Sequence, residues 1–199
     1  MTQTPSVTPT FQMIGPTITY MGVARADGNI TQPVDTAADG TKIFRRQVGF
    51  GFFLIVEAKV GQSGKPIGTS TFTSGQLPNF RIVVSRPLGN GSAAVCDDGP
   101  DPPIGGVPAV DPPSFDNVNA VNDLSCRFDA RTTGNDACTR NANQDPAFAS
   151  TQTRVQFCPV LGLGSELTFP PGDTRVTAEV TDVVGQPGAP QSIIIRVQP

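Results

Sequence analysis

Two alternating runs close to the C-terminal end constrain the fold of this chain more than any other feature. From Arg175 to Thr181, polar and apolar residues alternate, which is the pattern of a β-strand with one buried face and one face in solvent. A turn rich in Gly and Pro follows, and the chain then enters a β-branched run at 192–197. Two such runs around a turn are typical of a β-hairpin. The pattern therefore predicts a pair of antiparallel strands and an all-β fold.

The rest of the chain repeats this pattern of short apolar runs separated by turns. The 21 Gly and 20 Pro residues among 199 favour many turns and argue against a helical protein. Strands at this spacing indicate a single antiparallel two-sheet β-sandwich domain over residues 17–199. We expect its further strands at 17–24, 42–46, 49–60, 69–73, 80–86, 154–158 and 166–169.

Two of these expected strands predict how their side chains are arranged. The run at 49–60 is apolar on both faces at its centre, as in a central strand that is covered on both sides. Gly49 and Gly51 within it suggest a β-bulge or a close backbone approach. In the run at 17–24, Tyr20 and Met21 are neighbours, so one of them should face the core and the other should point away.

The stretch from about 96 to 150 differs in character, because it is rich in Asp, Asn and Pro. Nine Asp residues against three Arg residues lie between Asp97 and Asp145, so this part of the chain is strongly acidic. We expect a long, loop-rich insertion that is held in place by disulfides. Within it, the spacing of apolar residues predicts a short helix at 114–124.

The chain contains four cysteines, an even number, and they fall in or next to this insertion: Cys96, Cys126, Cys138 and Cys158. We interpret them as two disulfides, which are typical of proteins outside the cytosol. Three pairings are possible. We expect Cys96–Cys126 with Cys138–Cys158, because nearest-neighbour loops suit a locally pinned insertion. The sequence thus predicts an extracellular or cell-surface protein. Its first residues lack a signal-peptide pattern, so we expect the export signal to lie outside the sequence given.

The absence of histidine restricts the chemistry that the chain can perform. Histidine is the commonest general acid/base and the commonest metal ligand. The cysteines also lack the close spacing of zinc ligands. The sequence carries no basic stripe for nucleic acid and no run of eighteen apolar residues that would span a membrane. We therefore expect a protein that is not an enzyme, with no nucleic-acid partner and no membrane span.

The densest acidic cluster stands at the start of the insertion and consists of Asp97, Asp98 and Asp101. Carboxylate oxygens are the ligands that calcium prefers, so these three residues are a candidate calcium site. The spacing lacks the ligand pattern of an EF-hand loop, and a solvated turn beside a disulfide is the alternative interpretation. No cofactor other than calcium is expected.

Glu57 is the second acidic residue of interest, because it interrupts an otherwise apolar strand. A buried carboxylate needs a partner, and Arg45, Arg81 and Arg86 are the candidates. We expect a structural ion pair or a strand-edge position at this residue, and the sequence predicts no catalytic residue.

The C-terminal run also carries a resemblance to a known family. The turn at 182–186 and the β-branched strand at 193–197 resemble the final strand pair of bacterial immunoglobulin-like extracellular domains, which end in a strand, an Asp-x-x-Gly-Asn turn and a β-branched strand. Gln186 stands where Asn is usual. The resemblance covers residues 170–197. It implies an immunoglobulin-like sandwich and an exported structural, adhesive or surface-display role.

Residues 1–16 are rich in Thr, Pro and Gln and carry no charged side chain, which is typical of an extended arm or linker. Such an arm could lie along the open sheet edge of a neighbour, as in β-augmentation, with Val7, Phe11 and Ile14 as anchors. We expect an exported, non-enzymatic module whose partners are itself or other surface proteins, in its sharper form a subunit of a filament or surface array. The alternative is calcium-dependent adhesion or carbohydrate binding through the acidic insertion.

Overall fold

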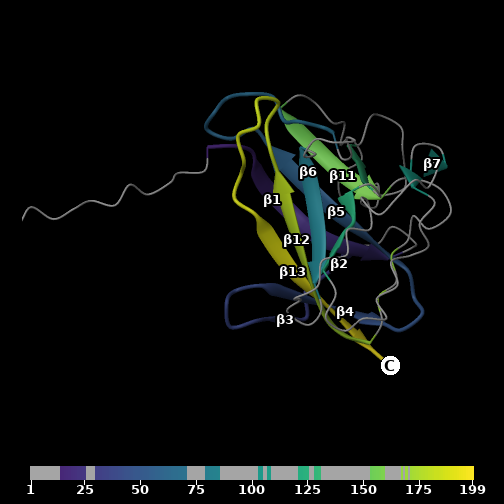
Figure 1. Cartoon of the computed structure of the whole chain (residues 1–199). Helices are drawn as coiled ribbons and strands as arrows, with labels where there is room; N and C mark the ends of the chain where they lie inside the picture. Colours follow the sequence, from purple (N-terminus) through teal and green to yellow (C-terminus); the bar gives the residue numbers. More distant parts are fainter. Residues whose placement is uncertain are drawn as a thin grey trace, which may run out of the picture.

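The described part of the chain folds into β-strands. The computed structural model describes residues 14–25, 30–70, 79–85, 103–104, 107–108, 121–125, 128–130, 153–159, 167, 169 and 171–199. No α-helix occurs in these ranges, and accordingly none that is long and apolar enough to cross a membrane. The expectation of an all-β fold is confirmed. Two large sheets and one two-stranded ribbon account for the strands (Figure 1).

The first sheet has five strands in the order β10-β11-β5-β1-β2, and every neighbouring pair is antiparallel. Its members are β1 (Thr17–Arg25), β2 (Ile30–Thr31), β5 (Phe52–Lys59), β10 (Phe128–Ala130) and β11 (Arg154–Pro159). The strands predicted at 17–24 and 154–158 are confirmed as β1 and β11. The central place of β5, between β1 and β11, matches its prediction as a central strand.

The second sheet has six strands in the order β3-β4-β13-β12-β6-β9. Its members are β3 (Asp35–Thr36), β4 (Lys42–Gln47), β6 (Phe80–Ser85), β9 (Val121–Asp123), β12 (Gly172–Val180) and β13 (Gln191–Gln198). The strands predicted at 42–46 and 80–86 are confirmed as β4 and β6. A separate ribbon pairs β7 (Pro103–Ile104) with β8 (Val107–Pro108).

The predicted C-terminal hairpin is confirmed as the antiparallel pair β12–β13, in which Arg175 lies opposite Ile194. Along β12 the small apolar residues Val176, Ala178 and Val180 are buried, as the alternation requires. The turn depends on Gly185, whose φ of 83° is a left-handed conformation that favours glycine. Its N–H donates to the Asp182 carbonyl at 3.0 Å and closes the turn.

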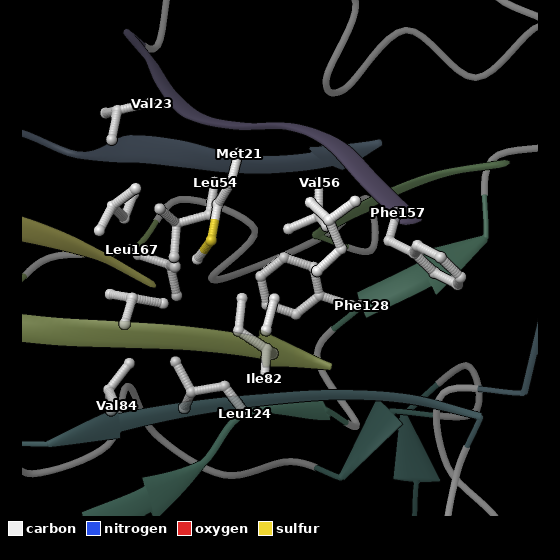
Figure 2. Packing of buried hydrophobic residues seen from close by; sticks show 14 of the residues in the cluster. Met21, Val23, Leu54, Val56, Ile82, Val84, Leu124, Phe128, Phe157 and Leu167 are labelled. Carbon is white, nitrogen blue, oxygen red and sulfur yellow. The ribbon is translucent and has the colours of Figure 1, made fainter. Parts of the chain in front are cut away.

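Both sheets contribute to one hydrophobic core, so their buried faces lie against each other (Figure 2). Phe157 of β11 stacks on Phe80 of β6, with ring centroids 4.1 Å apart and planes 8° apart. Phe128 packs against the same Phe80 ring at 5.6 Å. Stacked rings and interdigitated aliphatic side chains therefore join the two layers, which gives the molecule the character of a β-sandwich.

The outward face of the first sheet is also buried around β5. Phe53, Ile55 and Glu57 point away from the common core, yet their exposed fractions are 8%, 0% and 2%. The prediction that β5 is covered on both faces is confirmed. Tyr20 of β1 joins this outward cluster while Met21 lies in the core, as their neighbouring positions require.

Three details of the sequence-based prediction are wrong where the structure describes them. In the helix predicted at 114–124, Val121–Asp123 instead form strand β9 on β6, because pairing with a sheet edge outweighs a weak helical pattern, while residues 114–120 lie outside the described residues. Gly49 and Gly51 precede β5 and form no bulge within it, and Gly49 occupies a turn at a φ of 78°. The sheets are also not wholly antiparallel, since β4 runs parallel to β13. Alternation of side chains carries no information on strand direction.

Two weaker strand predictions are only partly described. The run expected at 69–73 is not a strand at its first two residues, although the Ser70 carbonyl accepts the Phe80 N–H at 3.0 Å. Residues 71–73 lie outside the described ranges. In the run expected at 166–169, Leu167 forms an isolated bridge with Phe52.

Candidate functional site: the root of the N-terminal arm

One end of the molecule, which we call the hairpin end, is formed by the turn at 182–188 and the turn at 61–66. Asp182 is fully buried there. Its carboxylate accepts hydrogen bonds from the Ser63 hydroxyl at 2.8 Å and from the N–H groups of Val184 at 3.1 Å and Gln186 at 2.8 Å. A buried charge is tolerated only when it is paired or hydrogen-bonded in this way. The two turns are therefore held together as one unit.

Asn79, just before β6, connects a third segment to this unit. Its side-chain amide donates to the Thr181 hydroxyl at 3.0 Å and to the Asp182 carbonyl at 3.2 Å. The N–H of Val183 in turn donates to the Pro66 carbonyl at 3.0 Å. These hydrogen bonds join three segments of the chain into one platform at the hairpin end.

The N-terminal segment is bound to this platform at residues 14–16, which we call the arm root. The Gly15 N–H donates to the Pro187 carbonyl at 3.1 Å, and the Ser63 N–H donates to the Ile14 carbonyl at 2.9 Å. The arm root thus lies between the two turns and bonds to both. Residues 1–13 precede a point whose position in the molecule is well defined.

Glycines make this close approach possible. A Cβ atom on Gly61 would lie 1.7 Å from the Gly15 carbonyl oxygen, and one on Gly188 would lie 1.8 Å from the Pro16 carbonyl oxygen. No side chain fits at such distances from backbone atoms. The arm root is therefore held by direct backbone packing.

Apolar side chains stand exposed around the arm root. The exposed fractions are 37% for Ile14, 57% for Val183 and 59% for Val184. Large apolar residues are exposed singly on most proteins, but here three occupy one end. They form an apolar surface beside the start of the arm.

The far end of β13, which we call the opposite end, also exposes apolar residues. Val48 is 46% exposed and Phe50 is 64% exposed, and both lie in the turn that joins β4 to β5. The Val48 N–H donates to the Gln198 carbonyl at 3.0 Å, which places this turn at the C-terminal end of β13. In Figure 1 the end marked C lies away from the turn between β12 and β13.

The predicted assembly residues are placed only in part. Ile14 lies in the arm root at the hairpin end, while Val7 and Phe11 lie outside the described residues. The candidate calcium ligands Asp97, Asp98 and Asp101 also lie outside them. Within the described ranges, no group of three or more Cys, Asp or Glu residues is arranged to hold a metal ion.

Of the four cysteines, Cys158 alone is described. It lies on β11 in the outward cluster of the first sheet and is disulfide-bonded. Cys96, Cys126 and Cys138 lie outside the described residues, so the pairing of the cysteines stays a prediction.

Glu57 is paired, and the partners that the structure describes are not the expected Arg45 or Arg81. Its carboxylate accepts a hydrogen bond from the Gln156 amide at 3.1 Å and lies 3.7 Å from the Arg154 guanidinium. Both partners belong to the neighbouring strand β11. Arg45 and Arg81 belong to the second sheet, and Arg86 lies outside the described residues. The contact between Glu57 and Arg154 is a structural ion pair, as expected for a buried carboxylate.

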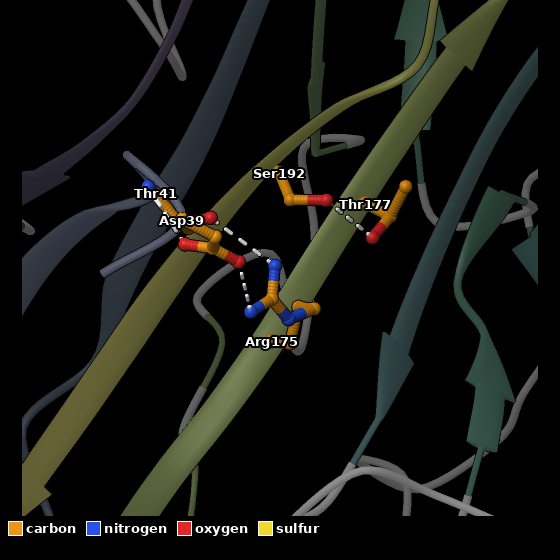
Figure 3. A network of polar contacts seen from close by, with 5 residues as sticks. All are labelled: Asp39, Thr41, Arg175, Thr177 and Ser192. Atoms are coloured by element: carbon orange, nitrogen blue, oxygen red, sulfur yellow. Dashed lines mark hydrogen bonds and ion pairs between the residues drawn. The ribbon is translucent and has the colours of Figure 1, made fainter. Parts of the chain in front are cut away.

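A second polar network ties the loop before β4 to the outward face of the second sheet (Figure 3). Arg175 of β12 donates to the Asp39 carboxylate at 2.9 Å and to the Thr41 hydroxyl at 3.2 Å. The Thr41 N–H donates to Asp39 at 3.0 Å. Hydrogen bonds from Thr41, together with the Arg175 guanidinium, lower the pKa of Asp39 from 3.8 to about 2. This clamp is charged and exposed, and it holds the 37–41 turn across β13.

The sequence predicted the turn at 182–186 but not the hydrogen bonds that the Asp182 carboxylate accepts there. The Asp-x-x-Gly pattern signals a turn, and nothing local in the sequence shows that Ser63, 119 positions away, would donate to it. Gly61 and Gly188 carry no pattern that shows what approaches them.

The arm root is therefore described by its hydrogen bonds and its close backbone packing. The chain matches no protein-family model, no curated protein and no solved structure.

Proposed function

We propose that this chain is an exported, non-enzymatic subunit that assembles with further copies of itself through its N-terminal arm. The observation that carries the proposal is the arm root. Hydrogen bonds from Gly15 to Pro187 and from Ser63 to Ile14 hold the start of the arm at the hairpin end. The starting point of the arm is thereby fixed, and a fixed attachment point lowers the entropic cost of binding a neighbour.

The composition of the arm supports the same function. Residues 1–13 carry no charged side chain, and Val7 and Phe11 give it apolar anchors. A segment of this kind can add a strand to an exposed sheet edge, since its backbone supplies the hydrogen bonds and its apolar residues supply contacts.

We further propose that the domain is immunoglobulin-like. The strand orders support this: an immunoglobulin domain has strands A, B, E and D in one sheet and C, F and G in the other, with C′ beside C in the larger variant. Taking β1, β5, β6, β9, β10, β11, β12 and β13 as A, B, C, C′, D, E, F and G reproduces both orders. The chain departs from antibody domains in having no cysteine on β5 or β12.

Location outside the cytosol is supported by the cysteines. Their number is even, and Cys158 is disulfide-bonded. Disulfides of this structural kind form and persist in oxidising compartments.

The test compares the full chain with a variant that lacks residues 2–13 and keeps the arm root. Light scattering and negative-stain imaging of the non-reduced proteins report assembly, and thermal unfolding checks that the variant folds. We expect fibres or sheets from the full chain, whose mass is 20.8 kDa. We expect the variant to be a monomer of slightly lower mass than one full chain. A full chain that stays monomeric at every concentration would contradict the proposal, as would a folded variant that still assembles.

A further inference from the structure

We propose that the acceptor for the arm is the outer edge of β4 in a second copy, so that copies join head to tail. This inference rests on the proposed function, namely that the arm connects copies. It adds the identity of the accepting strand and the polarity of the assembly.

In the described residues, the outer side of β4 is paired over only part of its length, and near its far end the Arg46 guanidinium donates to the Thr31 hydroxyl at 3.3 Å. On its inner side β4 pairs with β13 from Lys42 to Gln47. On its outer side, β3 is paired only with Lys42 and Ile43. In the described part of the chain, no strand continues this ladder beyond Ile43. The segment Phe44–Gln47, which we call the acceptor edge, is long enough to pair with a short strand.

The direction of the backbone groups along the acceptor edge follows from two hydrogen bonds. The Ile43 carbonyl accepts the Val34 N–H at 2.8 Å, so it points outward, away from β13. The Val48 N–H donates to Gln198, so it points inward. Because backbone groups alternate along a strand, the N–H and C=O of Arg45 point outward. Arg45 therefore presents a donor and an acceptor to an incoming strand.

The parts of β1 and β6 that extend beyond their short neighbours β2 and β9 suit an arm less well. The pairing of β1 with β5 is irregular at Thr19, and the Ile18 carbonyl already accepts the Gln191 amide at 3.0 Å. The outer groups of Ile82 on β6 are bonded to the Ser125 hydroxyl and the Leu124 N–H. The acceptor edge of β4 is regular, which favours strand addition.

The geometry of the two ends sets the polarity. β13 starts at the hairpin end and has eight residues, so the two ends of the sheet are about 25 Å apart. The arm root lies at the hairpin end, whereas the acceptor edge runs to the opposite end at Val48. An arm that leaves one copy at its hairpin end therefore meets the next copy at its opposite end.

Apolar residues occupy both of these ends. Val183 and Val184 stand exposed beside the arm root, and Val48 and Phe50 stand exposed beside the acceptor edge. End-to-end contact would bury all four side chains, and such burial favours association. A contact between two different surfaces does not close on itself, so it generates a chain of copies.

Charge favours the arm over a second β4 strand as the occupant. Arg45 is exposed, and two β4 edges paired around this residue would bring two guanidinium groups together. Residues Thr10–Met13 of the arm are uncharged and free of proline, and they directly precede the arm root. We therefore assign them as the segment that would occupy the acceptor edge.

The test is a proline at an outward-facing position. Because the Arg45 N–H points outward, Arg45→Pro removes one donor of the acceptor edge and no bond to β13. Arg45→Ala is the matched control, since it removes the same charge and keeps the donor. We expect Arg45→Pro to lose the high-mass species in sedimentation and images, with its melting temperature close to that of Arg45→Ala. We expect Arg45→Ala to assemble like the unmodified chain.

A mixing experiment separates the two proposals. The variant lacking residues 2–13 keeps the acceptor edge, and Arg45→Pro keeps the arm. Each should be monomeric alone, and together they should form a dimer of one copy each that grows no further. If Arg45→Pro folds and assembles, or if the mixture stays monomeric, the acceptor edge is wrong while assembly through the arm can still stand. If the full chain itself never assembles, both proposals fall.

Discussion

Asp182 is the residue on which the hairpin end depends most. Its carboxylate accepts hydrogen bonds from the Ser63 hydroxyl in the turn at 61–66 and from two backbone N–H groups in its own turn. Asp182→Ala leaves all three donors without this acceptor, and we expect it to lower the free energy of unfolding by about 2–3 kcal/mol. Urea unfolding measures the change. Asp182→Asn should lose less, because its amide oxygen still accepts from the backbone, and equal losses would contradict this account.

Thr174 is a buried polar residue that, unlike Asp182, lacks hydrogen bonds within the described residues. It is fully buried on the core face of β12, and its hydroxyl has no hydrogen-bond partner there. A buried hydroxyl of this kind is destabilising. We expect Thr174→Val to raise the free energy of unfolding by about 1 kcal/mol, since it replaces the hydroxyl with a methyl group. Thr174→Ser keeps the hydroxyl and should lower stability, and thermal unfolding of the three proteins compares them.

At the scale of elements, the clamp between Asp39 and Arg175 gives the 37–41 turn a dependence on pH. The pKa of Asp39 is lowered from 3.8 to about 2, so the clamp stabilises the fold above 3.8 and loses its effect as the pH falls toward 2. We expect the melting temperature of Asp39→Asn to lie below that of the unmodified chain at neutral pH. The difference should shrink as the pH falls from 3.8 through 2 and vanish below pH 2, and it should also shrink in high salt, because the pair is exposed. A difference that stays undiminished as the pH falls below 2 would show that the charge of Asp39 is not its cause.

The elements also show how far the sequence can be interpreted without a structure. The strands with clear alternation or β-branched runs, such as β12 and β13, were predictable because their own residues specify the buried face. The short strand β9 was not, because only its contact with β6 makes Val121–Asp123 a strand. The relative direction of β4 and β13 could not be predicted either, because the same alternation of side chains fits a parallel and an antiparallel pair.

The same distinction applies to the candidate site. Ile14 and the turn at 182–186 carry local signals, namely an apolar residue in a polar arm and an Asp-x-x-Gly pattern. The sequence did not indicate Arg154 as a partner of Glu57, because the choice among arginines depends on strand order, which places β11 beside β5. Contacts between distant segments depend on the order of the strands in the sheets, and no single segment of the sequence specifies that order.

At the scale of the whole molecule, the proposed assembly has a salt dependence that separates it from a charged interface. The arm is uncharged, and the two ends meet through valine and phenylalanine side chains. We expect the assembled fraction to stay constant or rise from low to high salt, because apolar and backbone contacts are not screened. Sedimentation over a salt series measures this. Dissolution at high salt would instead point to the charged outward face of the second sheet, where Arg175 and Arg196 pair with Asp39 and Asp173.

The parallel pair of β4 and β13 has a consequence for how the chain reaches its folded state. Ile43 and Ile194 are neighbours in the sheet although about 150 residues separate them. β13 also lies between β4 and β12, so the second sheet cannot close until this late strand has been synthesised. Contacts of such long range slow folding, because a large loop must be ordered before they form. We expect a nascent chain of this topology to stay unfolded for longer than a hairpin-by-hairpin protein would, and under the proposed export this delay would keep it in the state in which a polypeptide can pass through a narrow channel.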